Sequence, residues 1–194
     1  SISGADATHL GCFDISLIGN IPNIVYLAPT SKQEYLAMLD WSVEQQKYPV
    51  AIRVPFGPLA ESDRPVPQDY SELNRYEVVS KGGEVAIIGA GNFFHLGRQV
   101  KEELKRALGI DATLINPRYL PGLDEELLES LKKDHRLVIT LEDGIVNGGF
   151  GEKIASFYGG SDMKVLNFGA KKEFTDRVPL DELYRRFHLT KEQI

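Results

Sequence analysis

Two ionisable side chains near the start of the chain, Asp6 and His9, have the types and spacing that proton chemistry needs. They stand three residues apart between Gly4 and Gly11, and glycines let a backbone turn sharply and approach a ligand closely. Asp and His side chains exchange protons or hold hydroxyl groups near neutral pH. On these residues alone, an Asp that caps a helix and a solvated surface His explain the pattern more simply than a site does.

The segment that follows this pair predicts a strand, a helix and a second strand. After a short apolar helix from Phe13 to Ile18, residues 24–27 form an apolar run typical of a buried strand. Ser31 and Glu34 have the spacing of a capping box, which starts a helix that we expect to end near residue 46. Residues 49–54 then predict the next strand. A strand–helix–strand order indicates a parallel sheet.

Prolines and polar residues mark a change of texture between residues 55 and 71. Such a composition is typical of an extended linker between domains. We therefore predict a first domain at residues 1–56, a linker at 57–72 and a second domain at 73–194.

The second domain alternates strands with helices, as expected of a small doubly wound α/β fold. The strands are predicted at residues 84–89, 112–115, 137–141 and 164–167, and the helices at 96–108, 123–133, 152–158 and 180–187.

Charge and composition limit the classes of partner. The net charge is −6 and the pI is about 5.3, which argues against a nucleic-acid or anionic-membrane surface. The sequence contains no apolar run near the roughly 20 residues that span a bilayer and no recognisable signal peptide. The single cysteine, Cys12, fits a reducing compartment. We expect a cytoplasmic protein that acts on small molecules.

The segment from Gly4 to Asp14 resembles the 1-deoxy-D-xylulose-5-phosphate synthase family, thiamine-diphosphate enzymes related to transketolase. The resemblance continues in order through nearly the whole chain, at residues 20–23, 28–30, 51–55, 84–89, 140–142, 148–151 and 165–169. It identifies residues 1–56 as the end of a pyrimidine-binding parallel-sheet domain and residues 73–194 as a transketolase C-terminal domain. Because the chain starts with Ser1 and leads directly into a site-like turn, we expect a fragment of a longer polypeptide.

The resemblance implies that the parent condenses pyruvate, with loss of CO2, with D-glyceraldehyde 3-phosphate, for isoprenoid precursor and thiamine biosynthesis. It places Asp6 and His9 beside the substrate as catalytic and binding groups, and Arg53 as a further binding candidate. Thiamine diphosphate and Mg²⁺ are expected in a homodimeric parent, with no cofactor or metal ligands in this chain. The isolated chain should then be inactive.

Two departures from the family pattern affect this interpretation. The stretch between Asp6 and His9 is one residue shorter than in the family, and Leu10 replaces a glutamine. Phe56 stands where the family places an arginine that grips the acceptor's phosphate, and no aromatic residue replaces a guanidinium fork. We hypothesise an acceptor without a phosphate, or one held by other residues. For Arg53, an ion pair with a neighbouring domain and a ligand contact remain equal alternatives.

Two glycine-rich turns are interpreted as structural. Residues 89–94 lack the third glycine of a dinucleotide fingerprint, because Phe94 stands there. Glu142 and the glycines of residues 148–151 follow a strand in the predicted second domain, away from the thiamine by resemblance. Other thiamine enzymes, either a transketolase or the β-subunit of a 2-oxoacid dehydrogenase, remain alternatives. So does a non-catalytic dimerisation module.

Overall fold

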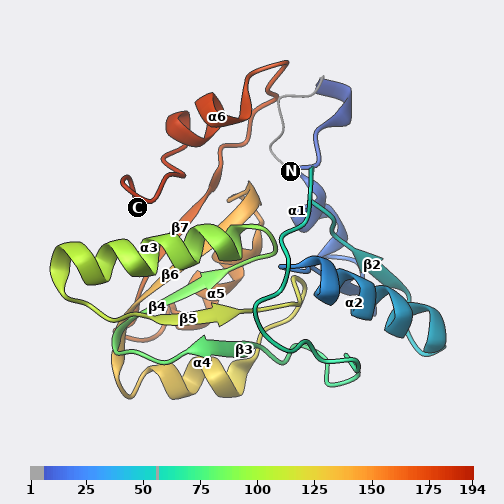
Figure 1. Ribbon diagram of the computed structural model, residues 1–194, viewed down its shortest axis with the longest axis horizontal. Coiled ribbons are helices and arrows are strands. Elements are labelled where there is room, and N and C mark those ends of the chain that lie inside the picture. The colour runs from blue at the N-terminus through green and yellow to red at the C-terminus, as the bar shows by residue number, and fades with distance from the viewer. Residues whose placement is uncertain (1–6, 56) are drawn as a thin grey trace.

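The computed structural model describes residues 7–55 and 57–194, so the predicted site residue Asp6 and the substituted position Phe56 lie outside the described residues. The described chain forms two sheets, one of two strands and one of five. Figure 1 shows the two-stranded unit, with helix α2, beside the larger sheet and its helices. The α/β class is therefore confirmed.

The two-stranded sheet has the predicted strand–helix–strand order. Strands β1 (Val25–Leu27) and β2 (Val50–Ile52) pair in parallel, and α2 (Lys32–Glu44) connects them. The 3-10 helix η1 (Ala7–His9) and the short helix α1 (Asp14–Ile18) precede this unit. Its apolar core is small and consists of Val25, Leu27, Ala37, Met38, Trp41, Tyr70 and Tyr119.

The five-stranded sheet is mostly parallel. Its strands are β3 (Glu77–Ser80), β4 (Glu84–Gly89), β5 (Thr113–Asn116), β6 (His135–Ile145) and β7 (Lys164–Ala170). They lie in the order β3-β5-β4-β6-β7, and β3 alone runs antiparallel to its neighbour. The sequence did not predict β3, because four residues at a sheet edge carry little periodicity.

Helices cover both faces of this sheet, as a doubly wound fold requires. Side chains of β4 alternate between two apolar clusters, one on each face of the sheet. On one face, Val85 and Ile87 pack with α3 (Phe93–Leu108) and α6 (Leu180–Arg186). Ala86 and Ile88 pack with α4 (Glu125–Leu131) and α5 (Phe150–Tyr158). The alternation follows from the two-residue period of a strand.

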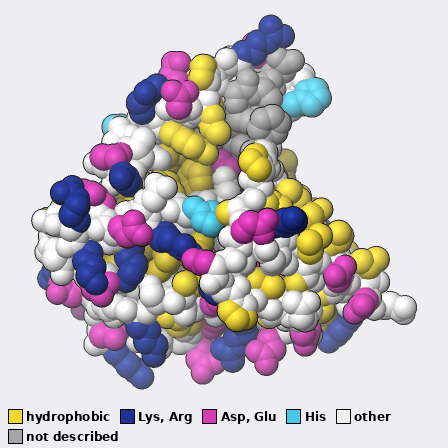
Figure 2. Space-filling model, viewed as in Figure 1, with side chains coloured by type: hydrophobic (Ala, Val, Ile, Leu, Met, Phe, Trp, Pro, Cys, Tyr) yellow, Lys and Arg dark blue, Asp and Glu magenta, His cyan; other side chains and the backbone are white. Residues whose placement is uncertain are grey.

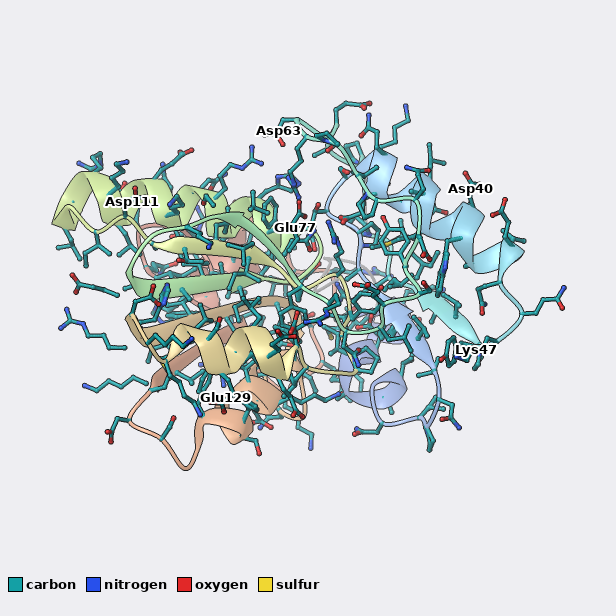
Figure 3. The ribbon with its side chains drawn as sticks, turned by 90° about the horizontal axis from the view of Figure 1, so that it is seen from below. Asp40, Lys47, Asp63, Glu77, Asp111 and Glu129 are labelled. Carbon is teal, nitrogen blue, oxygen red and sulfur yellow. The ribbon has the colours of Figure 1, made fainter. Side chains whose placement is uncertain are left out.

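Backbone hydrogen bonds join the two units along β1. The amide of Ala28 donates to the carbonyl of Arg118 at 2.8 Å, and that of Leu120 donates to Tyr26 at 3.0 Å. Figure 3 shows Glu77 between the α2 unit and the larger sheet, whereas Asp40 and Lys47 lie on the outer side of that unit. Polar residues at this junction can therefore contact both units.

No helix in the described part of the chain is long and apolar enough to cross a membrane.

Candidate functional site

His9 lies on the surface, at the end of η1. Its Nδ1 is 2.8 Å from the hydroxyl oxygen of Thr8. Since Asp6 lies outside the described residues, the predicted Asp6–His9 pair stays a prediction.

Arg53 follows β2 and is buried, with only 8% of its surface exposed. Its Nε donates to Oδ2 of Asp14 at 2.6 Å, and its Nη2 donates to the carbonyl of Gly11 at 3.0 Å. Nη2 also donates to the carbonyl of Asp143, and Nη1 lies 3.9 Å from Oδ2 of the same residue. One guanidinium thus joins the loop after His9, the end of β2 and the end of β6.

This geometry shows one of the two predicted alternatives for Arg53, an ion pair that reaches the neighbouring domain. Asp143 is fully buried on β6, within the predicted second domain. Contact between Arg53 and a substrate stays a prediction.

Asp14 accepts a further hydrogen bond, from the hydroxyl of Tyr26 at 2.5 Å. Burial raises the pKa of the Asp14 carboxyl, but the charge and hydrogen bond of Arg53 and the Tyr26 hydroxyl outweigh it and leave the pKa below its usual value. Burial lowers the pKa of Arg53, but Asp143 and Asp14 reverse that effect and raise it. The pair is therefore ionised at neutral pH. We call Arg53, Asp14, Tyr26, Asp143 and the carbonyl of Gly11 the Arg53 cluster.

The loop that contributes to this cluster is also tied to β6 through the backbone. The amide of Ile145 donates to the carbonyl of Cys12 at 2.9 Å. A Cβ atom at Gly144 would lie 3.0 Å from Cδ1 of Ile15, so the first turn of α1 packs directly on the strand. The loop between His9 and α1 is therefore held to the five-stranded sheet at several points.

Glu142, next to Asp143, closes the glycine-rich turn before α5. Its carboxylate accepts from the amides of Phe150 at 2.9 Å and Gly151 at 2.8 Å. A Cβ atom at Gly149 would lie 2.4 Å from Oε2 of Glu142, so this turn has no room for a side chain. Burial raises the pKa of Glu142 to about 7, because it outweighs the two amides and Arg53, which lower it. These hydrogen bonds within the chain fit the structural role predicted for Glu142, which stays a prediction.

The turn at residues 89–94 is also built by packing. A Cβ atom at Gly89 would lie 2.6 Å from Cα of Phe94, which is fully buried. The ring Nε2 of His95, the next residue, lies 2.7 Å from the carbonyl of Thr30.

A second buried polar cluster surrounds Glu34 on α2, a residue with 1% of its surface exposed. Its Oε2 accepts from the amide and the hydroxyl of Thr30, each at 2.8 Å. Its Oε1 accepts from Nε of Arg118 at 3.0 Å and from the amide nitrogen of Asn116 at 3.1 Å. Arg118 also pairs with Glu77 through a 2.9 Å contact. We call these five residues the Glu34 cluster.

The sequence gave a partial signal for this second cluster. Ser31 caps α2 as predicted, by accepting from the amide of Glu34 at 3.2 Å. Glu34 reaches back one residue further than a capping box would place it, to Thr30. Its contacts with Asn116 and Arg118 were missed, because those residues stand more than 80 positions away.

The described residues do not by themselves fit a diphosphate–Mg²⁺ site. Among residues 7–55 and 57–194, no group of three or more His, Cys, Asp or Glu side chains is placed to hold a metal ion. The glycine-rich helix start that would suit a phosphate already holds the carboxylate of Glu142.

Comparison with known proteins places this geometry in a known family. The sequence model described as the transketolase C-terminal domain matches residues 74–194. A 1-deoxy-D-xylulose-5-phosphate synthase of Clostridium acetobutylicum is 33% identical over 198 residues, which cover 100% of this chain and 31% of that protein. The synthase of Synechococcus sp. strain JA-2-3B'a(2-13) is 37% identical, over 93% of this chain and 28% of that protein. The chain thus spans about 30% of these relatives.

Solved structures show the same fold. A split-gene transketolase, described as an inactive β4 tetramer, superposes with a TM-score of 0.79 at 23% identity, over 96% of this chain and 60% of that one. A transketolase mutant from Pichia stipitis gives a TM-score of 0.74 at 16% identity, over 100% of this chain and 27% of that one.

Proposed function

We propose, because this chain belongs to the transketolase family through residues 74–194, that it is the C-terminal portion of an enzyme similar to 1-deoxy-D-xylulose-5-phosphate synthase. The observation that carries the proposal is coverage: relatives with that name match the chain from end to end at 33% identity, beyond the C-terminal domain alone.

The proposed reaction joins pyruvate, after loss of CO2, to D-glyceraldehyde 3-phosphate, and supplies isoprenoid and thiamine precursors. Parts of the parent outside this chain would hold thiamine diphosphate and Mg²⁺, and the cofactor would make the carbon derived from pyruvate nucleophilic. The partners in this proposal are small-molecule substrates and a second copy of the parent.

In this proposal, His9 acts on the substrate. Its ring is exposed, and the contact of Thr8 with Nδ1 leaves Nε2 as the nitrogen that meets a substrate hydroxyl or oxyanion. An imidazole holds or moves a proton at such an atom near neutral pH. In the proposal, Asp6, three residues before His9 in the sequence, assists.

Arg53 is not the phosphate grip in this proposal, because its side chain is buried and its Nε and Nη2 already donate to Asp14, Gly11 and Asp143. With Phe56 at the position of the family's phosphate-binding arginine, the acceptor is the open part of the proposal. Other residues then hold the phosphate, or the acceptor lacks one.

An apolar surface supports assembly with further polypeptide. Figure 2 shows hydrophobic side chains gathered over β2 and α2. The large exposed apolar side chains there are Leu36, Leu39, Val43 and Val54. Exposed apolar area of this kind is typical of an interface. We propose that another part of the full-length parent covers it.

The test is CO2 release from pyruvate by the full-length parent with thiamine diphosphate and Mg²⁺. The acceptor is D-glyceraldehyde 3-phosphate or D-glyceraldehyde. We expect release that depends on the phosphorylated acceptor. Release with D-glyceraldehyde but not with its 3-phosphate would show that the acceptor lacks a phosphate. Absence of release with either acceptor would overturn the proposed function.

A matched pair of variants tests the role of His9. His9→Ala should lower kcat about 10²- to 10⁴-fold, the usual range for a lost acid–base group. His188→Ala removes another exposed histidine, on the segment after α6, and should leave kcat unchanged. Equal effects of the two variants would remove His9 from the mechanism.

A further inference from the structure

We infer that Asp14, held by Arg53, is the positioning residue that sets the orientation of the loop carrying His9. This inference rests on the function proposed above. Its basis is that Asp14, Gly11 and Asp143 all accept hydrogen bonds from the guanidinium of Arg53. Gly11 lies two residues after His9 in the sequence.

The contacts of Asp14 fix both of its carboxylate oxygens. Oδ2 accepts from Nε of Arg53 at 2.6 Å and from the hydroxyl of Tyr26 at 2.5 Å, and Oδ1 lies 3.3 Å from Nη2 of Arg53. Two donors come from one planar group, which fixes direction as well as distance. The start of α1 therefore has a set orientation relative to β1 and β2.

Gly11 transmits this orientation towards His9. Its carbonyl accepts from the same Nη2 of Arg53 at 3.0 Å, two residues after His9. The loop has a second directional contact at the carbonyl of Cys12, which accepts from the amide of Ile145 at 2.9 Å. Leu10 and Phe13 pack against the apolar core, a contact that has no preferred direction. The carbonyl of Gly11 and the carboxylate of Asp14 thus share one donor group, the guanidinium of Arg53.

The other end of Arg53 is anchored in the five-stranded sheet. Nη2 donates to the carbonyl of Asp143, and Asp143 itself is fully buried on β6. Because the sheet is the most extensively paired part of the molecule, it serves as the fixed reference for the loop. A displacement of about 1 Å at a reacting group is enough to cost on the order of 10² in rate.

The test uses Asp14→Asn in the full-length parent, with Glu34→Gln as the matched control. Both variants replace an arginine-paired carboxylate by its isosteric amide, half-buried at Asp14 and buried at Glu34, but only Asp14 contacts the segments around the loop. We expect Asp14→Asn to lower kcat about 10- to 100-fold with less than a threefold change in the KM for pyruvate. Glu34→Gln should keep kcat within twofold.

Amide hydrogen exchange on this chain gives a second readout that does not depend on activity. Asp14→Asn should speed exchange at residues 8–13 at least tenfold, and Glu34→Gln should leave those amides unchanged. Asp14→Glu, which keeps the charge, should restore part of the protection and part of kcat.

Failure of the inference and failure of the proposed function are distinguishable. An inactive wild-type parent sinks the proposed function, and exchange at residues 8–13 still decides the inference. Unchanged exchange and kcat in Asp14→Asn, or equal changes in both variants, would overturn the inference. If Asp14→Asn does not fold, Tyr26→Phe removes only the hydroxyl that bonds Asp14 and should produce a smaller effect at the same amides.

Discussion

The Arg53 cluster and the Glu34 cluster both join the β1–α2–β2 unit to the five-stranded sheet, but their charges are arranged in opposite ways. Arg53 is a single cation between two carboxylates from distant segments. Glu34 is an anion that accepts from Arg118, Asn116 and Thr30, and Arg118 has a second carboxylate in Glu77. Loss of Arg53 therefore removes the ion pair of the fully buried Asp143 with Arg53, whereas loss of Glu34 leaves Arg118 paired with Glu77.

The segments that the clusters connect also differ. The Arg53 cluster holds the loop after His9, whereas the Glu34 cluster holds the start of α2. We expect a defect in the first to reach the candidate site and a defect in the second to remain a defect of stability.

Arg53→Met should produce the largest change. It keeps much of the side-chain length but removes the cation from the half-buried Asp14 and the fully buried Asp143. Removing one partner of a buried pair costs about 3–5 kcal/mol. Urea unfolding of the chain measures this cost directly, and a loss below about 1 kcal/mol would contradict the central place given to Arg53.

Glu142, next in sequence to Asp143 of the Arg53 cluster, should make the stability of the chain depend on pH. Burial raises the pKa of Glu142 from its ordinary 4.5 to about 7 in the folded chain. The folded state then holds its proton more tightly than the unfolded state, so the free energy of unfolding should fall as pH rises from about 4.5 to about 7. The total loss is about 3 kcal/mol.

Unfolding curves for wild type and Glu142→Gln across this pH window measure the effect. The variant lacks the titrating group, so its stability should vary less with pH, whatever its absolute value. Parallel pH profiles would show that Glu142 does not titrate in this window. Asp14 acts in the opposite sense, because its lowered pKa makes its contribution disappear only as pH falls below its usual 3.8.

The regular part of the molecule could be predicted because its signals are local. Strand β4 lies at residues 84–89, where the apolar run placed it, and α2 begins at the predicted cap Ser31. Strand β6 is longer than the predicted 137–141, because its pairing with β7 resumes at Ile145 after an irregularity. Strand β3 was missed because its partner β5 lies over thirty residues away.

The two clusters could not be predicted, because their partners are distant in sequence. Asp14 and Asp143 stand 39 and 90 positions from Arg53, and no local pattern links them. The sequence marked Arg53 as a charged residue at the end of a strand, which left an ion pair and a ligand contact equally open. Only the approach of β2, β6 and the loop after His9 shows the ion pair.

Glu34→Gln should cost less than Arg53→Met, about 1.5–3 kcal/mol, the range for hydrogen bonds to charged groups. Its amide would place donor hydrogens against the donors of Thr30 or Arg118, but Arg118 keeps its pair with Glu77. Urea unfolding is the measurement. A cost equal to that of Arg53→Met would remove the distinction between the two clusters.

Ser31→Ala should produce the smallest change, about 0.5–1 kcal/mol, at the low end for an N-cap. The hydroxyl of Ser31 accepts one hydrogen bond, from the amide of Glu34, whereas the Glu34 carboxylate binds Thr30 independently. Thermal unfolding of both single variants and the double variant measures the coupling. If Ser31→Ala lowers the free energy of unfolding as much as Glu34→Gln does, the contribution of Glu34 to stability comes from the start of α2. A clearly smaller cost assigns the remainder to Arg118 and Asn116, which bind Glu34 from the five-stranded sheet side of the junction.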